Sequence, residues 1–181
     1  MFHQSPTRSV FLVAALVGLA LYAIYGGYFA REIVIEIAIL AILAISLDVV
    51  AGFGGMVSLC HGAILGVSAY TYGILTAKLG YPALPSAVAA IAAAAVFGTV
   101  VGWITARTTG IYFIMATLAF GQMAYTVIFK SRWLGGDDGM GGLPRFDLDW
   151  AGIAMNKSLP FALFAVLAIF ACYVAAAWVM R

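Results

Sequence analysis

The stretch GFGGMVSLCHGAILG, residues 52 to 66, interrupts apolar sequence with glycines and brings serine, cysteine and histidine into a region that otherwise suits lipid. Within it, only Gly52-Phe53-Gly54-Gly55 separates two apolar segments, and no charged residue marks the boundary. A short glycine break is typical of a discontinuous or re-entrant helix, which is tolerated at membrane depth only beside protein or a watery cavity. A tight helix hairpin at the membrane surface is the alternative.

The composition of the 181-residue chain places this stretch in a membrane protein. Hydrophobic residues make up 65% and charged residues 9%, whereas an ordinary soluble domain carries roughly 25% charged residues. The net charge of +2 comes from nine basic and seven acidic residues without a basic run. We therefore expect a lipid bilayer as the surroundings of the chain and no nucleic acid as a partner.

Six apolar segments approach the roughly 20 helical residues that cross a bilayer core about 30 Å thick. They cover about 10–26, 33–50, 57–77, 84–106, 111–129 and 159–180. Because lipid offers no hydrogen bonds to backbone groups, each segment is expected to be helical. The sequence predicts an all-α fold, a polytopic transmembrane helix bundle of about six spans, with a glycine-broken or re-entrant segment between spans 2 and 3. We expect one transmembrane domain over residues 1–181.

The orientation of this bundle is ambiguous from charge. The first apolar segment follows Arg8 and ends without a small-residue cleavage site, which favours an uncleaved first span over a signal peptide. With six spans and a cytoplasmic N-terminus, Arg8, Arg107 and Arg181 lie on the cytoplasmic side and the other six basic residues lie opposite. The positive-inside rule therefore favours the reverse orientation.

Polar side chains share one face of the third segment. Ser58, His61, Leu65, Ser68 and Tyr72 recur at spacings of three and four, which is the period of a helix face. His61 fits either a structural hydrogen bond or a pathway role, because a neutral imidazole is tolerated inside a bundle.

Small residues form stripes on the third and fourth segments. They are Gly62, Gly66, Ala69 and Gly73 on the third segment and Ala90, Ala94, Gly98 and Gly102 on the fourth. Stripes of this kind let helix backbones approach closely. The third and fourth segments are therefore predicted to pack together.

The fifth segment carries Thr117 and Gly121 on one side, with Gln122 and Tyr125 beside them. A serine or threonine hydroxyl in such a segment either contacts a substrate or bonds a carbonyl of its own helix. The candidate substrate-pathway residues are Ser58, His61, Ser68, Thr117 and Gln122. The candidate helix-break and packing residues are Gly52, Gly54, Gly55, Gly62, Gly66 and Gly121.

Asp48 lies one helical turn before the glycine break. A charge at membrane depth costs at least about 2.5 to 3.5 kcal/mol on insertion scales, so a carboxylate there requires a partner, a cavity or a proton. The alternative is that Asp48 caps the free N–H groups of the following helix.

Motifs for enzyme chemistry are absent from the sequence. No GxxxxGK[ST] phosphate loop or HExxH metal motif occurs, and His3 and His61 are far apart. Cys60 and Cys172 lie in apolar stretches and indicate neither a disulfide nor a metal site. The stretch GGDDGMGGLPR, 135 to 145, lacks EF-hand ligand spacing and is interpreted as a glycine-rich turn. We expect no catalytic residue and no bound metal.

Three stretches resemble the inner-membrane permease subunits of branched-chain amino-acid ABC importers, of the LivM type. The stretch LDVVAGFGGMVSLCHGAILGVSAYT, 47 to 71, is similar to the family segment L-N-L-x-x-G-Y-x-G-Q-x-S-L-G-H-A-x-F-x-G-x-G-A-Y. TTGIYFIMATLAFGQM, 108 to 123, is similar to R-G-I-Y-F-A-x-x-T-L-A-F-G-E, and GGDDGMGGLPR to G-G-x-D-G-L-x-G-I-P. The chain departs from the family by carrying Asp48 for Asn, Met56 for Gln, Cys60 for Gly and Gln122 for Glu.

The resemblance implies a multi-pass protein of the bacterial inner membrane with a cytoplasmic N-terminus at residues 1–9 and an extracytoplasmic loop at 130–158. It implies a transport subunit for branched-chain, leucine-like amino acids rather than an enzyme. The implied partners are a homologous second permease subunit, two cytosolic ATP-binding subunits and a periplasmic substrate-binding protein. This chain is then expected to bind no cofactor, with ATP used by the partner ATPases. Because the family's ATPase-coupling loop follows the sixth span, the chain resembles the N-terminal part of a permease.

Three other functions remain open from the residues. One is a permease for urea or short amides, which shares these motifs. Another is a proton-coupled secondary carrier that uses Asp48 and His61 as relay groups. The third is a membrane scaffold that transports nothing.

Overall fold

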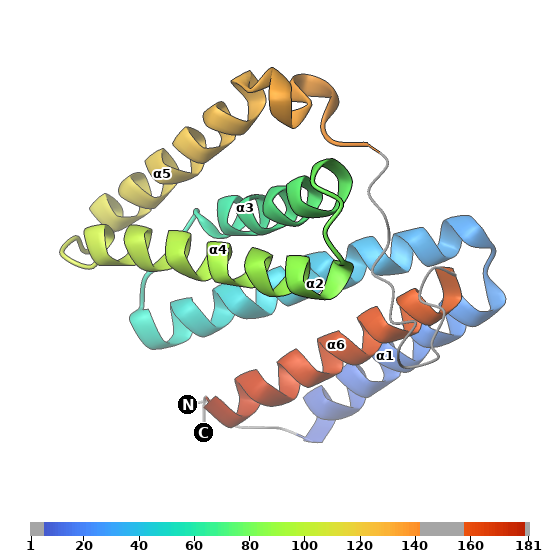
Figure 1. Ribbon diagram of the computed structural model, residues 1–181. Coiled ribbons are helices and arrows are strands. Elements are labelled where there is room, and N and C mark those ends of the chain that lie inside the picture. The colour runs from blue at the N-terminus through green and yellow to red at the C-terminus, as the bar shows by residue number, and fades with distance from the viewer. Residues whose placement is uncertain (1–5, 142–157, 180–181) are drawn as a thin grey trace. The chain divides into compact units, whose positions relative to one another are not determined.

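The computed structural model describes residues 6–141 and 158–179, and every regular element in that part of the chain is helical (Figure 1). The α-helices are α1 (Pro6–Tyr25), α2 (Tyr28–Gly54), α3 (His61–Gly73), α4 (Ala83–Thr105), α5 (Ile111–Lys130) and α6 (Ser158–Val179). A π-helix, η1 (Ile74–Lys78), extends α3, and two 3₁₀ turns, η2 (Arg132–Leu134) and η3 (Gly136–Asp138), follow α5. The all-α prediction is confirmed for the described residues.

Among the described residues, four helices are long and apolar enough to cross a membrane. They are α4, α5, α6 and the Tyr28–Gly52 part of α2. The apolar part of α1, Ala14–Tyr25, is shorter. The predicted span at 57–77 begins later than expected, because α3 starts only at His61. With η1 the helical stretch continues to Lys78, the end that the sequence predicts to within one residue. At 1.5 Å per residue α3 alone is about 20 Å long, and η1 adds five residues toward the roughly 30 Å of a bilayer core.

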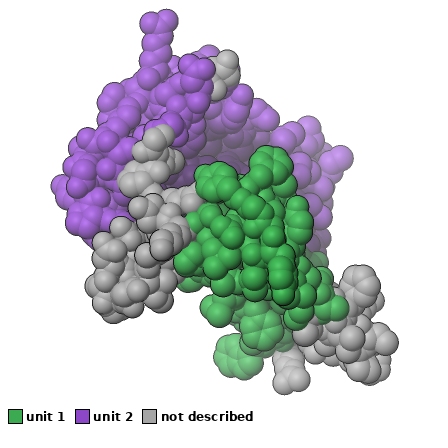
Figure 2. Space-filling model, turned by 90° about the vertical axis from the view of Figure 1, so that its right-hand side faces the viewer, with its two compact units in different colours: residues 1–49, 147–181 green, residues 50–146 purple. Residues whose placement is uncertain are grey.

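The chain divides into two compact units, residues 1–49 with 147–181 and residues 50–146 (Figure 2). The prediction of one transmembrane domain stays a prediction, as do the assignments of 1–9 and 130–158 to opposite sides of a membrane. Residues 1–5, 142–157 and 180–181 of these assignments lie outside the described part of the chain.

In the first unit, small and branched side chains of α1, α2 and α6 form a core. Its buried members are Ala23, Val34, Ile35 and Ala162, with Leu19, Phe161 and Val166 packed around them. Arg31 of α2 joins the ends of the other two helices, since its Nε donates to Ala23 O at 3.1 Å and its Nη1 to Ser158 Oγ at 3.4 Å. These two hydrogen bonds join the Arg31 side chain of α2 to both α1 and α6.

In the second unit, α3 packs against both α4 and α5 (Figure 1). Gly98, one residue of the small stripe on α4, lies in this contact, because a Cβ placed on it would be 3.6 Å from Ile64 Cδ1 of α3. The predicted pairing of the third and fourth segments is therefore found. Gly110, with φ +59°, makes the turn that starts α5.

Most hydroxyls in the second unit bond to carbonyls of their own helices. The donors include Thr71, Thr76, Ser86, Thr99, Thr105 and Thr126, each bonded to the carbonyl four residues earlier at 2.7 or 2.8 Å. Such a hydroxyl is satisfied without a partner on another helix. A hydroxyl that bonds a residue outside its own helix shows instead how two segments are joined. Thr117 has such a hydroxyl.

Candidate functional site

The break between α2 and α3 begins later than the glycines predicted. Gly52 and Gly54 lie in the last turn of α2, so their assignment to the break is wrong. Gly55 has φ +60° and donates its N–H to Ala51 O at 2.9 Å. This left-handed conformation is one that glycine adopts without strain, so Gly55 ends α2 and starts the non-helical segment Gly55–Cys60, here called the break.

Thr117 of α5 holds the break in place. Its Oγ1 accepts a hydrogen bond from the N–H of Leu59 at 3.2 Å and donates to Ile114 O at 3.0 Å. The Thr117 side chain is 1% exposed. One buried hydroxyl therefore satisfies a backbone donor of the break and is itself held by its own helix.

Ser58 and Gly121 complete this contact. Ser58 is buried, and its Oγ accepts a hydrogen bond from the N–H of Cys60 at 3.4 Å. A Cβ placed on Gly121 would lie 3.6 Å from Leu59 O and 4.0 Å from Cys60 Cα. The absence of a side chain at Gly121 lets the break lie against α5.

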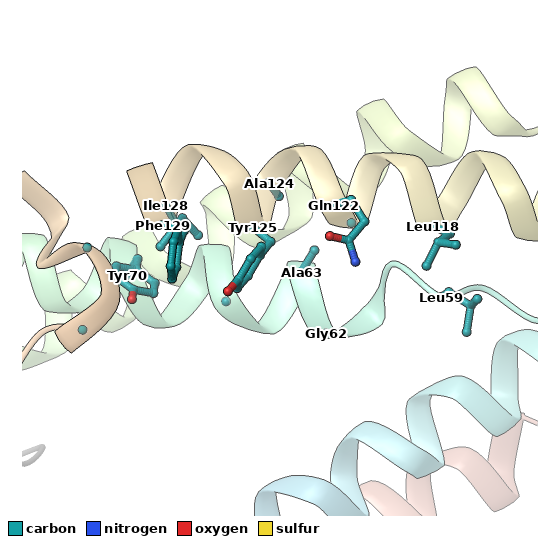
Figure 3. A pocket seen from close by; sticks show the side chains of 14 residues that line it. Leu59, Gly62, Ala63, Tyr70, Leu118, Gln122, Ala124, Tyr125, Ile128 and Phe129 are labelled. Carbon is teal, nitrogen blue, oxygen red and sulfur yellow. The ribbon is translucent and has the colours of Figure 1, made fainter. Parts of the chain in front are cut away.

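A cavity of about 480 Å³ extends from the break along the space between α3 and α5 (Figure 3). Its walls come from α3, from Leu59 of the break, from α5, and from the turn after α5. The lining residues are Leu59, Gly62, Ala63, Gly66, Tyr70, Leu118, Gly121, Gln122, Ala124, Tyr125, Ile128, Phe129, Gly136 and Gly139. Ligand sites in proteins commonly occupy about 300 to 1,000 Å³, so this cavity has the size of a small-molecule site.

The cavity changes in character along its length. At the break, Leu59 faces Leu118, and Gln122 projects from α5 toward Ala63 (Figure 3). At the far end, Phe129 lies near Tyr70. Because the early residues of α3 face the early residues of this α5 stretch, the two helices run in the same direction. The Gln122 amide is therefore surrounded by largely apolar and aromatic lining residues.

The depth of the break follows from this parallel arrangement. Thr117 is six residues into α5, which is about 10 Å along the helix axis. If α5 crosses a bilayer, the break lies at membrane depth and α3 returns from it to the Lys130 end of α5. The helix break itself is present at Gly55–Cys60, and the choice between a re-entrant segment and a hairpin at the membrane surface stays a prediction.

The predicted pathway residues separate into two groups. Gln122 lines the cavity, whereas Ser58, His61, Ser68 and Thr117 are not among its lining residues. Ser68 Oγ donates to Leu65 O at 2.8 Å. His61 Nδ1 is buried and has no hydrogen-bond partner among the described residues. Whether these four side chains touch a substrate stays a prediction.

Gly62 and Gly66 line the cavity. A Cβ placed on either residue would meet no atom within 4 Å. The two glycines leave open space in the cavity wall among the described residues, and their role in packing against another helix stays a prediction. Gly121 alone of these three lies in close packing, against the break.

Asp48 does not cap α3 in this structure. It is an exposed residue of α2, before the end of that helix. The N-cap of α3 is Cys60, and no side chain caps it. The capping alternative is therefore wrong for Asp48, and its role as a buried charge stays untested.

Sequence reasoning missed the aromatic end of the cavity. Tyr70 follows Gly62 and Gly66 at intervals of four, and Tyr125 stacks on Phe129 with 5.4 Å between ring centroids. The helical spacing of these residues was visible in the sequence. This spacing indicates which residues share a helix face. It does not indicate that the faces of α3 and α5 enclose a cavity.

The described residues contain no group of three or more His, Cys, Asp or Glu side chains placed to hold a metal ion. Cys60 is buried and Cys172 partly buried, and both are free thiols. The chemistry that the cavity offers is therefore hydrogen bonding and apolar contact.

Comparisons with known proteins agree on one family. The model of the family described as "Branched-chain amino acid transport system / permease component" matches residues 29–181. The chain is 30% identical over 146 residues to the high-affinity branched-chain amino acid transport system permease protein LivM of Escherichia coli K12. It is 28% identical over 142 residues to the protein of the same name from Salmonella typhimurium LT2.

Each of these alignments covers 76% of this chain and 33% of the relative. The chain thus spans about a third of the length of the curated relatives it matches. No solved structure matches the chain.

Proposed function

The chain belongs to the family of branched-chain amino acid transport permease components, and on that premise we propose that it forms part of the translocation pathway of an importer for leucine-like amino acids. The cavity between α3 and α5 is the observation that carries this proposal. It combines a volume of about 480 Å³ with mainly apolar walls and one amide, that of Gln122. A zwitterion with an aliphatic side chain requires this combination of surfaces.

The two ends of the cavity suit the two parts of such a substrate. The Gln122 end adjoins the start of α3, where Gly62 and Ala63 also line the cavity. Backbone N–H groups and the positive end of the helix dipole favour a carboxylate there. Ile128, Tyr125 and Phe129 at the other end offer an apolar wall to an aliphatic side chain.

The proposal places the chain in the bacterial inner membrane as a transport subunit without enzymatic activity of its own. Its partners are a homologous second permease subunit, two cytosolic ATP-binding subunits and a periplasmic substrate-binding protein. ATP is used by the ATPase subunits, and this chain binds no cofactor. Binding and hydrolysis of ATP change the relative stability of inward-open and outward-open states, and the substrate crosses through the state that faces it.

Uptake measurements test this proposal. The protein is expressed with the other components of its transport system in bacteria whose own branched-chain amino-acid uptake has been deleted, and radiolabelled leucine uptake is followed. We expect uptake that stops when cellular ATP is depleted and that excess isoleucine or valine inhibits. Inhibition by urea or acetamide but not by isoleucine would replace the proposed substrate with a short amide.

The proton-coupled carrier has a different signature. Leucine uptake that is driven by a proton gradient in ATP-free vesicles would contradict the importer and support a relay through Asp48 and His61. Asp48 belongs to the first compact unit and His61 to the second, and neither lines the cavity. Nothing in the geometry of the described residues favours this relay over the importer.

A further inference from the structure

The chain after α5 folds into a short turn over the aromatic end of the cavity. This segment, Ser131–Gly139, is here called the glycine turn and contains η2 and η3. Gly136 and Gly139 line the cavity. A Cβ placed on Gly136 would lie 3.6 Å from Phe129 O, so the turn lies back against the end of α5.

Hydrogen bonds and glycines fix the conformation of the glycine turn. Ser131 O accepts from Leu134 N at 2.9 Å and from Gly136 N at 3.2 Å. Gly135 has φ +96° and leaves no room for a Cβ, which would collide with the Gly139 carbonyl. Glycine is required at Gly135 both for its backbone conformation and for this close approach. The glycine turn is therefore an ordered structural unit and not an irregular loop.

One cation–π contact joins the glycine turn to the α3 side of the cavity. Lys78, the last residue of η1, places its Nζ 4.1 Å from the centroid of the Trp133 ring. The Trp133 side chain is 59% exposed. Exposed cation–π pairs contribute only about 0.5 to 1 kcal/mol. We call this Lys78–Trp133 contact the clasp.

We infer that the glycine turn is a cover that controls access to the cavity from water, with the clasp as its closing contact. The turn supplies two residues of the cavity wall, and the clasp joins it to the helix on the opposite side. The small energy of the clasp lets the cover open without a large barrier, while its fixed internal geometry lets it close in the same position. The identity of the solute that passes the cover rests on the proposed function. The opening and closing of the glycine turn do not depend on it.

The other end of the cavity is a poorer entrance for a charged molecule. The break lies about 10 Å inside α5, and Leu59 and Leu118 form the walls there (Figure 3). In a bilayer, the Lys130 end of α5 and the clasp residues lie toward the membrane surface, where Lys and Trp are favoured. A charged solute therefore reaches the cavity beneath the glycine turn.

Thiol labelling tests the cover without any substrate. The chain, with Cys60 and Cys172 replaced by alanine, carries Gly66→Cys in the cavity and is held in lipid nanodiscs. The membrane-impermeant cationic methanethiosulfonate reagent MTSET is added and the labelling rate is measured. We expect Lys78→Met or Trp133→Ala to raise this rate about two- to fivefold, which corresponds to the loss of an exposed cation–π contact.

Matched variants separate the clasp from general damage. Lys78→Arg keeps a cation over the ring and is expected to label at the parent rate. The double variant Lys78→Met with Trp133→Ala is expected to label no faster than either single variant, because both changes remove the same contact. Ala69→Cys, an exposed position on α3 outside the cavity, is expected to label at one rate in all backgrounds.

The outcomes distinguish this inference from the proposed function. Unchanged Gly66→Cys labelling in both single variants, or additive increases in the double variant, would overturn the cover. Protection of Gly66→Cys by millimolar leucine is measured separately. Faster labelling in the clasp variants without protection by leucine would leave the cover standing and count against the proposed substrate.

Discussion

The Thr117 hydroxyl accepts a hydrogen bond from the Leu59 N–H at 3.2 Å, across 58 residues of sequence. This contact fastens the break to α5 and sets the inner end of the cavity. A buried N–H without a partner costs about 1 to 3 kcal/mol. The stability of the second unit should therefore depend on this hydroxyl.

Replacing Thr117 by valine tests that dependence. Valine keeps the shape of threonine but leaves the Leu59 N–H unpaired, and because this hydrogen bond is only partly buried we expect the free energy of unfolding to fall by about 1 kcal/mol. Thr117→Ser keeps the hydroxyl and should lose less. Unfolding in mixed micelles with increasing sodium dodecyl sulfate measures these changes. Thr126→Val is the control, because the exposed Thr126 hydroxyl bonds only Gln122 O, and an equal loss there would contradict the assignment.

Gly121 sets how closely the break lies against α5. A Cβ there would be in ordinary contact with Leu59 O at 3.6 Å, so Gly121→Ala should be tolerated. Gly121→Ile adds atoms beyond that Cβ and should displace the break at a cost of about 1 to 3 kcal/mol. The same unfolding assay measures both variants. Equal stability of the alanine and isoleucine variants would show that the break is not held at this distance.

Gln122 supplies the amide of the cavity wall. If it bonds a charged group of the substrate, Gln122→Leu should raise the KM for leucine uptake by about tenfold or more. Gln122→Glu, the residue of the similar family segment, tests whether a carboxylate is accepted in its place. Met123→Leu changes the neighbouring exposed residue outside the cavity. A similar KM for the Gln122→Leu and Met123→Leu proteins would remove Gln122 from the substrate site.

Arg31 ties α1 to α6 through two hydrogen bonds. Arg31→Gln should lower the free energy of unfolding by about 1 kcal/mol, since the side chain is partly exposed and water screens its charge. Arg31→Lys should restore little of this, because a single ammonium does not reproduce the planar fork. Arg107→Gln, at an exposed arginine, serves as the comparison. Identical thermal unfolding of the Arg31→Gln and Arg107→Gln proteins would contradict this role.

Local sequence signals predicted much of the fold. Continuous apolar segments gave the helices, and the glycines near Gly55 marked the break, because both depend on residues close in sequence. The position of the break was wrong by a few residues, since Gly52 and Gly54 stay helical in the last turn of α2. Helix propensity disfavours glycine by only about 1 kcal/mol, which packing and backbone hydrogen bonds can offset.

The candidate site was harder to predict, because a helical period shows which residues share a face and not which faces meet. The helical period predicts a polar face with His61 and Ser68, whereas the cavity opens beside that face, along Gly62 and Gly66. A stripe of small residues is compatible both with close helix packing and with the wall of a cavity. The bond between Thr117 and Leu59 joins distant segments, so no local pattern indicates it.

If the space between α3 and α5 carries the substrate, filling that space should stop transport, and leucine uptake by Gly66→Phe tests this most directly. Gly66 lines the cavity and has open space where a side chain would begin, so phenylalanine should fill the cavity without displacing a helix. Ala69→Phe, on the exposed side of α3, is the matched control. At equal amounts of protein in the membrane, we predict uptake at the background of permease-free cells for Gly66→Phe and near-parent uptake for Ala69→Phe. Parent-level uptake by Gly66→Phe would contradict the account.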